Sequence, residues 1–196
     1  YVIPMDGDGE DRPEEIKEFL NHIKSNIDKT IVGERVKRSE SFLFQICYKI
    51  HKLITFTFTG KNIKFGNFTC LPKITVEKMI NEKATWNSFS GSLTKVENNL
   101  ISIPSIRGSR YFEPSKMSFY KLVNHSLSII SVFRKTFLIR SALFIVLYIL
   151  FIKSNASVIT AIPLIILLIA VYSISNLSLR ENMDEFDKAL SNINDT

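Results

Sequence analysis

Two long apolar runs near the C-terminus constrain this chain more than any other feature. Residues 136–152 and 157–174 are almost free of charged side chains, and each has about the length that crosses the hydrocarbon core of a bilayer. Residues 153–156 between them leave room only for a tight turn. We therefore expect a transmembrane hairpin over residues 136–174, in which Pro163 is tolerated because membrane helices re-satisfy the freed backbone groups.

The basic residues around the hairpin predict its orientation. Arg134, Lys135 and Arg140 lie at the start of the first run and Arg180 follows the second, whereas the turn holds only Lys153. Because basic residues accumulate on the cytoplasmic side of membrane proteins, both ends of the hairpin are expected in the cytoplasm. The sequence thus predicts a multi-pass membrane protein with two spans.

The segment before the hairpin, residues 117–135, has the pattern of an amphipathic helix. We expect this helix to lie in the membrane interface. A packed helix of a soluble domain is the competing interpretation, and the position directly before the membrane segment favours the interface. The apolar positions are Phe119, Leu122, Val123, Leu127, Ile130 and Val132, and the polar ones are Lys121, Asn124, His125 and Arg134.

An acidic loop with two glycines follows the apolar residues at the N-terminus. On an extended backbone, residues two apart point the same way, so Asp6 and Asp8 aim two carboxylates at one point, with Glu10 as a third. Such oxygens suit Mg²⁺ or Mn²⁺ completed by phosphate. A solvated acidic turn is the alternative. A calcium loop of the EF-hand type that starts at Asp6 is excluded, because its twelfth position requires Glu and holds Lys17.

Two basic segments follow predicted strands. Arg35, Lys37 and Arg38 come after a short β run, 29–32, that Gly33 is expected to end. A second strand, 100–104, delivers a loop with three cations beside one serine. Guanidinium and ammonium groups suit phosphate oxygens, so both segments are candidate anion sites. For the first, a solvated basic turn is the alternative; for the second, a patch touching lipid headgroups, which does not exclude the phosphate role. The second set is Arg107, Arg110, Ser115 and Lys116.

Three segments together resemble the family 2 glycosyltransferases, in particular the polyprenyl- or dolichyl-phosphate sugar transferase branch. Residues 1–16, YVIPMDGDGEDRPEEI, resemble the strand, Asp-x-Asp and Pro-Glu segment of that family. Residues 32–38 are similar to its Gly-x-Arg strand end, and residues 107–118 to its Arg-x-x-Gly-x-Ser-Lys loop. Glu10 stands where the family often has Gln, and Glu113 where its loop usually has Gly.

The resemblance implies an α/β fold, the C-terminal part of a Rossmann-like sheet domain of the GT-A type, and a set of site residues. Asp6, Asp8 and Glu10 would bind Mg²⁺ or Mn²⁺, and Asp8 and Arg110 would be catalytic. Donor and acceptor would be held by the remaining members of the motifs. These substrate-binding residues are Arg35, Arg38, Asn67, Arg107, Ser115 and Lys116.

The resemblance also implies the reaction: transfer of a sugar from a nucleotide-sugar donor to a polyprenyl-phosphate lipid at the cytoplasmic face, as in cell-envelope biogenesis. The alternatives are transfer to a sugar hydroxyl of a glycolipid or polysaccharide, and a non-catalytic membrane-anchored binding protein. An upstream nucleotide-binding half is implied, so this stretch is expected to be N-terminally truncated and inactive alone. Membrane lipids and a second copy of the chain are further expected partners.

The remaining composition excludes other classes of function. The net charge of +6 is moderate, and no basic stripe interleaved with aromatic residues is present, so nucleic acid is not an expected partner. Cys47 and Cys70 lack metal or redox spacing and are expected to be reduced, buried thiols. The expected organisation is a sheet domain over 1–116, the interface helix over 117–135, the hairpin over 136–174 and a cytoplasmic tail over 175–196, helical or disordered.

Within the sheet domain, helical and strand patterns alternate. A helix is expected after Pro13, with acidic residues in its first turn and a core face. A longer helix over 39–60 carries His51 at a surface or partly packed position, a strand over 63–71 carries Asn67, and a short helix covers 74–81. The lone Trp86 is expected to be in the core, with stacking on a sugar as the alternative. The core face of the first helix comprises Ile16, Phe19, Leu20 and Ile23.

Overall fold

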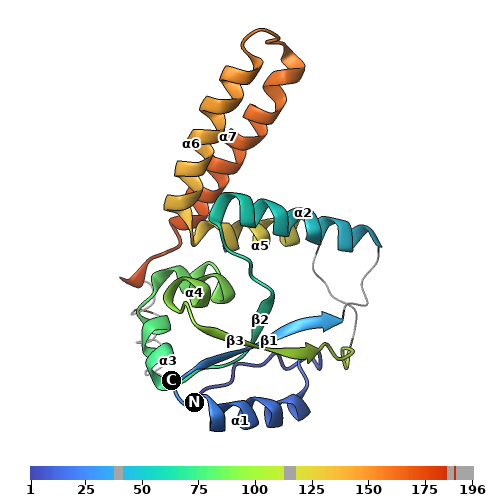
Figure 1. Cartoon of the computed structure of the whole chain (residues 1–196), viewed down its shortest axis with the longest axis vertical. Coiled ribbons are helices and arrows are strands. Elements are labelled where there is room, and N and C mark those ends of the chain that lie inside the picture. Colours follow the sequence, from blue (N-terminus) through green and yellow to red (C-terminus); the bar gives the residue numbers. More distant parts are fainter. Residues whose placement is uncertain (38–41, 113–117, 185–187, 189–196) are drawn as a thin grey trace.

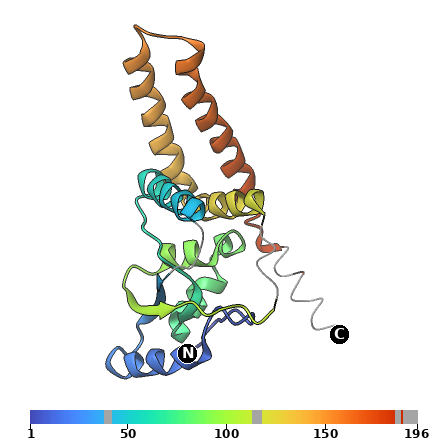
Figure 2. The ribbon, with the colours of Figure 1, turned by 90° about the vertical axis from the view of Figure 1, so that its right-hand side faces the viewer.

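The computed structural model describes residues 1–37, 42–112, 118–184 and 188. It consists of three layers stacked along the long axis of the molecule (Figure 1). A small α/β domain forms the base, two helices lie across it, and a pair of long helices rises above them (Figure 2). The α/β class and the helical hairpin are thus confirmed.

The α/β domain is built on a three-stranded mixed sheet of order β2-β1-β3. The strands are β1 (Thr30–Lys37), β2 (Phe65–Cys70) and β3 (Leu100–Ile106). The central strand β1 pairs antiparallel with β2 and parallel with β3. This topology shows a small mixed α/β sheet. It does not identify the domain as the expected GT-A type.

The expected end of β1 at Gly33 is wrong. The strand continues because its neighbour β3 continues beside it, with Gly33 opposite Ile103 and Arg35 opposite Ser105. Gly33 fits a close approach of the strands, since a Cβ there would stand 3.1 Å from Ser105 Cβ and 3.2 Å from the carbonyl oxygen of Phe68. Arg35 therefore projects from a strand and not from a loop.

Helix α1 (Ile16–Ser25) covers one face of the sheet, after the 3-10 turn η1 (Pro13–Glu15). Phe19 is fully buried and meets Phe68 edge to face, with ring centroids 4.8 Å apart. Ile16 and Ile23 pack against the same cluster as expected. Leu20 is 50% exposed, so its placement in the core face was wrong; at this position the helix has turned away from the sheet.

The other face of the sheet is covered by α3 (Lys73–Ile80), the 3-10 turn η2 (Lys83–Trp86) and α4 (Phe89–Val96). Their second core cluster contains Val32, Leu71, Met79 and Leu93. Ser88 caps α4 by accepting the Gly91 N–H at 3.1 Å. Trp86 is 49% exposed at the end of η2, which contradicts its expected place in the core.

Helices α2 (Phe42–Thr59) and α5 (Phe119–Ser131) form the middle layer at the same height in both views (Figures 1 and 2). Gly60 ends α2 with φ +74°, a left-handed conformation that glycine adopts without strain. The end of α5 is buried against the layers on both sides. Ile130 packs with the hairpin residues Phe137, Leu167 and Ile174, and Val132 and Phe133 pack against Ala84 of η2.

The upper layer is the helical hairpin of α6 (Arg134–Ile152) and α7 (Val158–Ser178). Both helices are long and apolar enough to cross a membrane, and most of their large apolar side chains face outward. A capping box joins Ser157 and Thr160 at the start of α7, and the Tyr148 hydroxyl donates to the Thr160 carbonyl at 3.1 Å across the hairpin. Pro163 lies inside α7 as expected.

Candidate functional site

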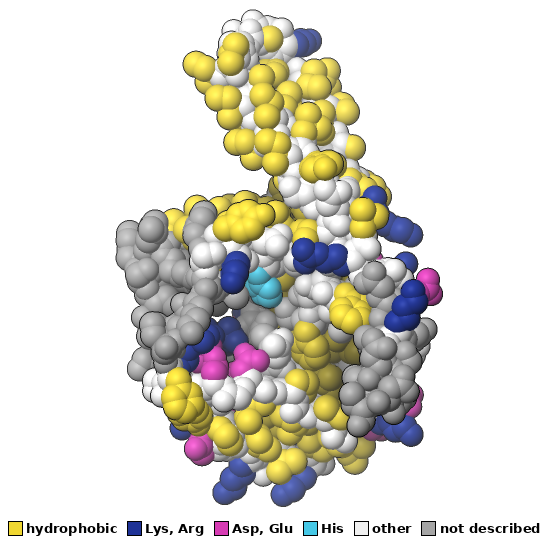
Figure 3. Space-filling view, turned by 180° about the vertical axis from the view of Figure 1, so that it is seen from behind, with side chains coloured by type: hydrophobic (Ala, Val, Ile, Leu, Met, Phe, Trp, Pro, Cys, Tyr) yellow, Lys and Arg dark blue, Asp and Glu magenta, His cyan; other side chains and the backbone are white. Residues whose placement is uncertain are grey.

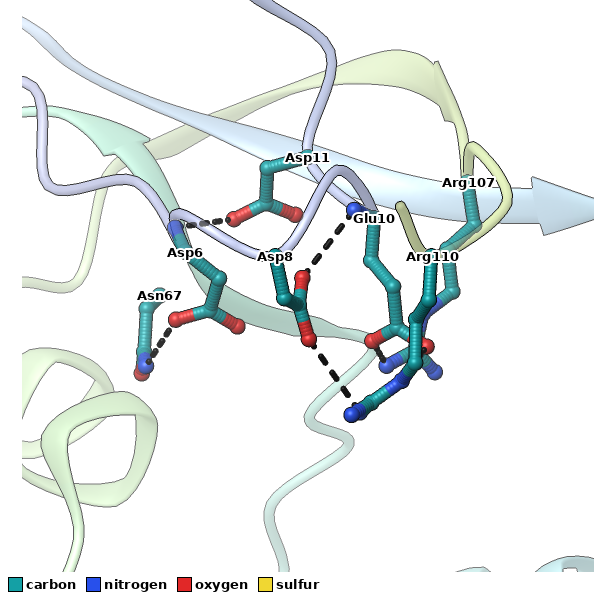
Figure 4. Close-up of polar contacts among 7 residues, drawn as sticks. All are labelled: Asp6, Asp8, Glu10, Asp11, Asn67, Arg107 and Arg110. Atoms are coloured by element: carbon teal, nitrogen blue, oxygen red, sulfur yellow. Dashed lines mark hydrogen bonds and ion pairs between the residues drawn. The ribbon is translucent and has the colours of Figure 1, made fainter. Parts of the chain in front are cut away.

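Two loops that lie near the two ends of the α/β domain's sequence are in contact in the structure (Figure 4). We call residues 5–12 the acidic loop and residues 107–112 the arginine loop. The Gly108 N–H donates to the Glu10 carbonyl at 2.8 Å, and the Tyr111 N–H donates to the Asp8 carbonyl at 3.0 Å. The backbone itself therefore sets the distance between the acidic and basic side chains.

Glycines make this close approach of the two loops feasible. A Cβ on Gly108 would overlap the carbonyl oxygen of Gly9. Gly9 has φ +92°, and a Cβ there would stand 2.9 Å from the ring of Tyr111. Both positions therefore exclude larger residues. At Gly108 the obstacle is a backbone atom, and at Gly9 it is the Tyr111 ring together with the left-handed backbone conformation.

The acidic loop is held in shape by its own carboxylates. Asp11 accepts the Asp6 N–H at 3.0 Å, and Asp8 accepts the Glu10 N–H at 3.0 Å. Asp11 is 5% exposed, and this burial raises the pKa of its carboxyl group, while the hydrogen bond from Asp6 and the charge of Arg35 lower it. Asp11 is thus a positioning residue that the sequence analysis missed, because a third Asp in an acidic run carries no distinct signal.

Arg107 and Arg110 pair with the acidic loop. Arg110 Nε lies 3.0 Å from Glu10 Oε1, and Arg110 Nη2 lies 3.2 Å from Asp8 Oδ2. Arg107 Nη2 contacts Glu10 Oε2. Burial lowers the pKa of Arg107, and the neighbouring charge of Arg110 lowers it further. Both oxygens of Glu10 therefore face guanidinium groups.

This pairing bears on the predicted metal ligands. Figure 4 shows the carboxylates of Asp6 and Asp8 on the same side of the acidic loop, with Glu10 turned toward the arginines. Within the described ranges, no group of three or more His, Cys, Asp or Glu side chains is arranged to hold a metal ion. Asp6 and Asp8 have the oxygen donors that Mg²⁺ or Mn²⁺ prefers, whereas Glu10 would first have to leave its arginine partners.

Two more predicted residues lie beside the acidic loop. The Asn67 side-chain amide, on β2, donates to Asp6 Oδ1 at 3.3 Å. Arg35, on β1, extends over Gly66, where a Cβ would stand 2.8 Å from its Nη2 atom. The charge of Arg35 also contributes, after burial, to the lowered pKa of His125 on α5. Strands β1 and β2 thus contribute to the same region as the two loops.

Glu15 connects the acidic loop to the end of β3. Its carboxylate accepts the Ser105 hydroxyl at 2.7 Å and the Ile106 N–H at 2.9 Å. These bonds hold β3 directly before Arg107, so Glu15 is a second positioning residue. The sequence indicated Glu15 only as an acidic residue in a first helical turn, a role that any carboxylate there would serve.

Arg38, Ser115, Lys116 and the neighbouring Glu113 lie outside the described residues. Where the structure does describe the region, acidic and basic side chains and a histidine gather around a hollow beneath the middle layer (Figure 3). The arrangement offers two carboxylates and several cations at one edge of a sheet, where parallel strands end and ligands commonly bind. Such a set can bind an anion directly or through a divalent cation.

No known protein family, no curated protein and no solved structure matches this chain.

Proposed function

We propose that this chain is part of a metal-dependent glycosyltransferase that moves a sugar from a nucleotide-sugar donor to a polyprenyl-phosphate lipid at the cytoplasmic face of a membrane. One observation carries the proposal. The acidic loop and the arginine loop, distant in sequence, are joined by backbone hydrogen bonds of 2.8 and 3.0 Å. They bring carboxylates and guanidinium groups together at the edge of the sheet below the middle layer, as a diphosphate site requires.

The chemistry suits an acceptor that is already anionic. A lipid phosphate needs less help from a general base than a sugar hydroxyl does. Asp6 and Asp8 would hold Mg²⁺ or Mn²⁺, which neutralises charge on the donor diphosphate. Arg110, now 3.2 Å from Asp8, would contact the phosphate oxygens and stabilise the negative charge that develops on the leaving diphosphate.

The position of the site relative to the hairpin supports a lipid substrate. The helices α2 and α5 separate the α/β domain from α6 and α7 (Figures 1 and 2). If the hairpin spans a bilayer, the middle layer lies at headgroup height, and the hollow beneath it lies within reach of a phosphate on a lipid. A soluble acceptor would require no such arrangement.

One observation favours the second candidate, a membrane-anchored binding protein without catalysis. Glu10 and Asp8 already pair with Arg107 and Arg110, so the cluster is balanced without a ligand. In that case the site would bind anions weakly and transfer no sugar.

Replacing Asp8 tests the proposed reaction. In the complete reading frame that encodes this chain, Asp8→Asn is expected to lower sugar transfer by roughly 100-fold or more, the size of effect seen when one charge-stabilising group is removed. Asp28→Asn is the matched control, because Asp28 is exposed and has φ +60°, a conformation Asn also adopts. Normal turnover in Asp8→Asn, or in excess chelator, would contradict the metal-dependent reaction. Anion binding without any transfer by the unmodified protein would favour the binding protein.

A further inference from the structure

The described part of helix α2 has its polarity reversed relative to a helix on the surface of a soluble domain. The face toward the rest of the protein carries buried Thr55 and Thr59 and half-buried His51, whose pKa is lowered by burial and by the nearby His125. The outward face is largely apolar, with Lys49 and Thr57 also exposed. Its exposed large apolar side chains are Ile46, Ile50, Leu53, Ile54 and Phe56. A contiguous outward apolar face indicates contact with a partner or a lipid surface.

Helix α2 is attached directly to the base of the hairpin. Arg140, on α6, donates to the carbonyl of Thr57 at 2.7 Å and to that of Phe56 at 3.3 Å. Phe58 packs against Phe137 of α6, with ring centroids 5.4 Å apart. The outward face of α2 therefore adjoins the exposed apolar surface of a helix that is long enough to span a membrane.

A shallow, open groove on α2 combines cationic and apolar side chains. It has a volume of about 350 Å³ and is lined by Lys49, Lys52, Leu53, Phe56 and Asn62. Lys49, Leu53 and Phe56 follow one another at helical spacing along one side of α2. Ammonium groups beside an apolar floor complement a phosphate attached to an acyl chain, because lysine can place its charge at headgroup level while its methylenes contact lipid.

We propose that α2 lies in the membrane interface and that this groove binds the headgroup phosphate of an anionic phospholipid. Lys49 and Lys52 contact the phosphate, and Leu53 and Phe56 contact the upper part of an acyl chain. Adjacency to the hairpin favours lipid over a second copy of the chain, and the two lysines favour an anionic headgroup. The proposal goes beyond the sugar transfer and does not depend on it.

Lipid-borne quenchers can test this contact in the full chain. An environment-sensitive fluorophore is attached to Cys at position 50 by Ile50→Cys, with Cys47 and Cys70 replaced, and the protein is placed in phosphatidylcholine nanodiscs. Brominated phosphatidylglycerol and brominated phosphatidylcholine are compared at equal mole fraction. We expect both lipids to quench the label, the anionic one roughly threefold more strongly, because Lys49 and Lys52 attract an anionic headgroup.

Two label positions control for insertion and orientation. A label at exposed Ile165 in α7 should be quenched equally by both lipids, and one at exposed Leu20 in α1 by neither. If Ile165 is quenched and position 50 is not, the hairpin inserts but α2 does not contact lipid, and the proposal fails. An α2 face covered by a second copy of the chain would give this same result.

Charge variants test the headgroup preference. Lys49→Gln with Lys52→Gln should reduce the ratio of quenching by the two lipids to about one, because the electrostatic attraction of the two lysines for an anionic headgroup is removed. Lys17→Gln with Lys24→Gln removes the same charge from the exposed side of α1 and should leave the ratio unchanged. Equal quenching by both lipids in the unmodified protein would overturn the anionic site. None of these readouts involves turnover, so they are independent of the proposed reaction.

Discussion

Glu10 has a different environment from the one its motif predicts. The resemblance implies a third metal ligand beside Asp6 and Asp8, yet both carboxylate oxygens of Glu10 face Arg107 and Arg110. Its side chain is only 13% exposed, so water screens these contacts little. We infer that Glu10 positions the two arginines and offsets their charge until an anionic ligand arrives.

Removing this negative charge should strengthen anion binding. Glu10→Gln leaves at most one acceptor oxygen for the two guanidinium groups, so Arg107 becomes available to phosphate, and Arg110 keeps only its contact with Asp8. Calorimetry with inorganic pyrophosphate, without divalent cations, should show affinity increased roughly tenfold, the equivalent of about 1.4 kcal/mol. Exposed Glu14→Gln serves as the charge-matched control. Unchanged pyrophosphate affinity together with lost Mn²⁺ binding would instead identify Glu10 as a metal ligand.

Gly108 offers a test of the joined loops that adds a single methyl group. In Gly108→Ala, the new Cβ meets the carbonyl oxygen of Gly9, so the arginine loop must move away from the acidic loop. Misplacement of about 1 Å can reduce turnover roughly 100-fold, and we expect a loss of that order with little change in melting temperature. Gly7→Ala is the matched control, since no atom beyond its chain neighbours lies within 4 Å of its Cβ position. Equal activity of the two variants would contradict the role of the loop contact.

Secondary structure was predicted well where local pattern decides it, and poorly where neighbouring strands or layers decide it. The periodicity around Phe19, the end of the long helix near residue 60 and the tight turn between the two apolar runs are local signals, and the structure has them. The extension of β1 beyond Gly33 depends on pairing with β3, which no local signal records. The ion pairs of Glu10 likewise depend on a loop about one hundred positions away, whereas proximity of Asn67 to Asp6 followed only from the family resemblance.

Arg140 supplies the hydrogen bonds between α6 and the end of α2, beside the packing of Phe58 against Phe137. Its removal should loosen the end of α2. In Arg140→Leu, the Thr57 carbonyl loses its bond from Arg140, and the Phe56 carbonyl keeps only the bond from the Gly60 N–H. The substitution also removes a positive charge that suits the negative end of α2. We expect a lower melting temperature in nanodiscs, corresponding to about 1–2 kcal/mol, and faster amide exchange in the last turn of α2. Arg134→Leu is the control at another exposed position of α6. If both variants exchange alike, the contact does not hold α2 in place.

The three layers are packed against one another from the sheet to the hairpin. The end of α5 is packed against η2 below, through Val132 and Phe133, and against α6 and α7 above, through Ile130. The Asn87 side-chain amide also donates to Glu181, beyond the end of α7, at 3.0 Å. Because the middle layer is packed on both sides, the hairpin fixes the height and tilt of the α/β domain relative to any membrane that it spans.

Because of this packing, the orientation of the hairpin in the membrane also determines on which side the α/β domain lies. Arg134, Lys135 and Arg140 lie near the start of α6 and Arg180 follows α7, against Lys153 at the turn, so the α/β domain is expected on the cytoplasmic side. At about 1.5 Å per residue, each helix is long enough for a core of about 30 Å with flanking side chains reaching the interface.

Cysteine labelling in intact cells decides the orientation. In a background without Cys47 and Cys70, Asn155→Cys at the exposed turn should react with an impermeant maleimide added outside, and Lys24→Cys on α1 should react only after permeabilisation. The two positions differ because the hairpin returns the chain to its starting side. Only the turn between α6 and α7 is then expected on the outer side of the membrane. Labelling of Lys24→Cys from outside, or extraction of the unmodified chain without detergent, would overturn this orientation. A lipid phosphate presented at the cytoplasmic leaflet would then be out of reach of Asp8 and Arg110.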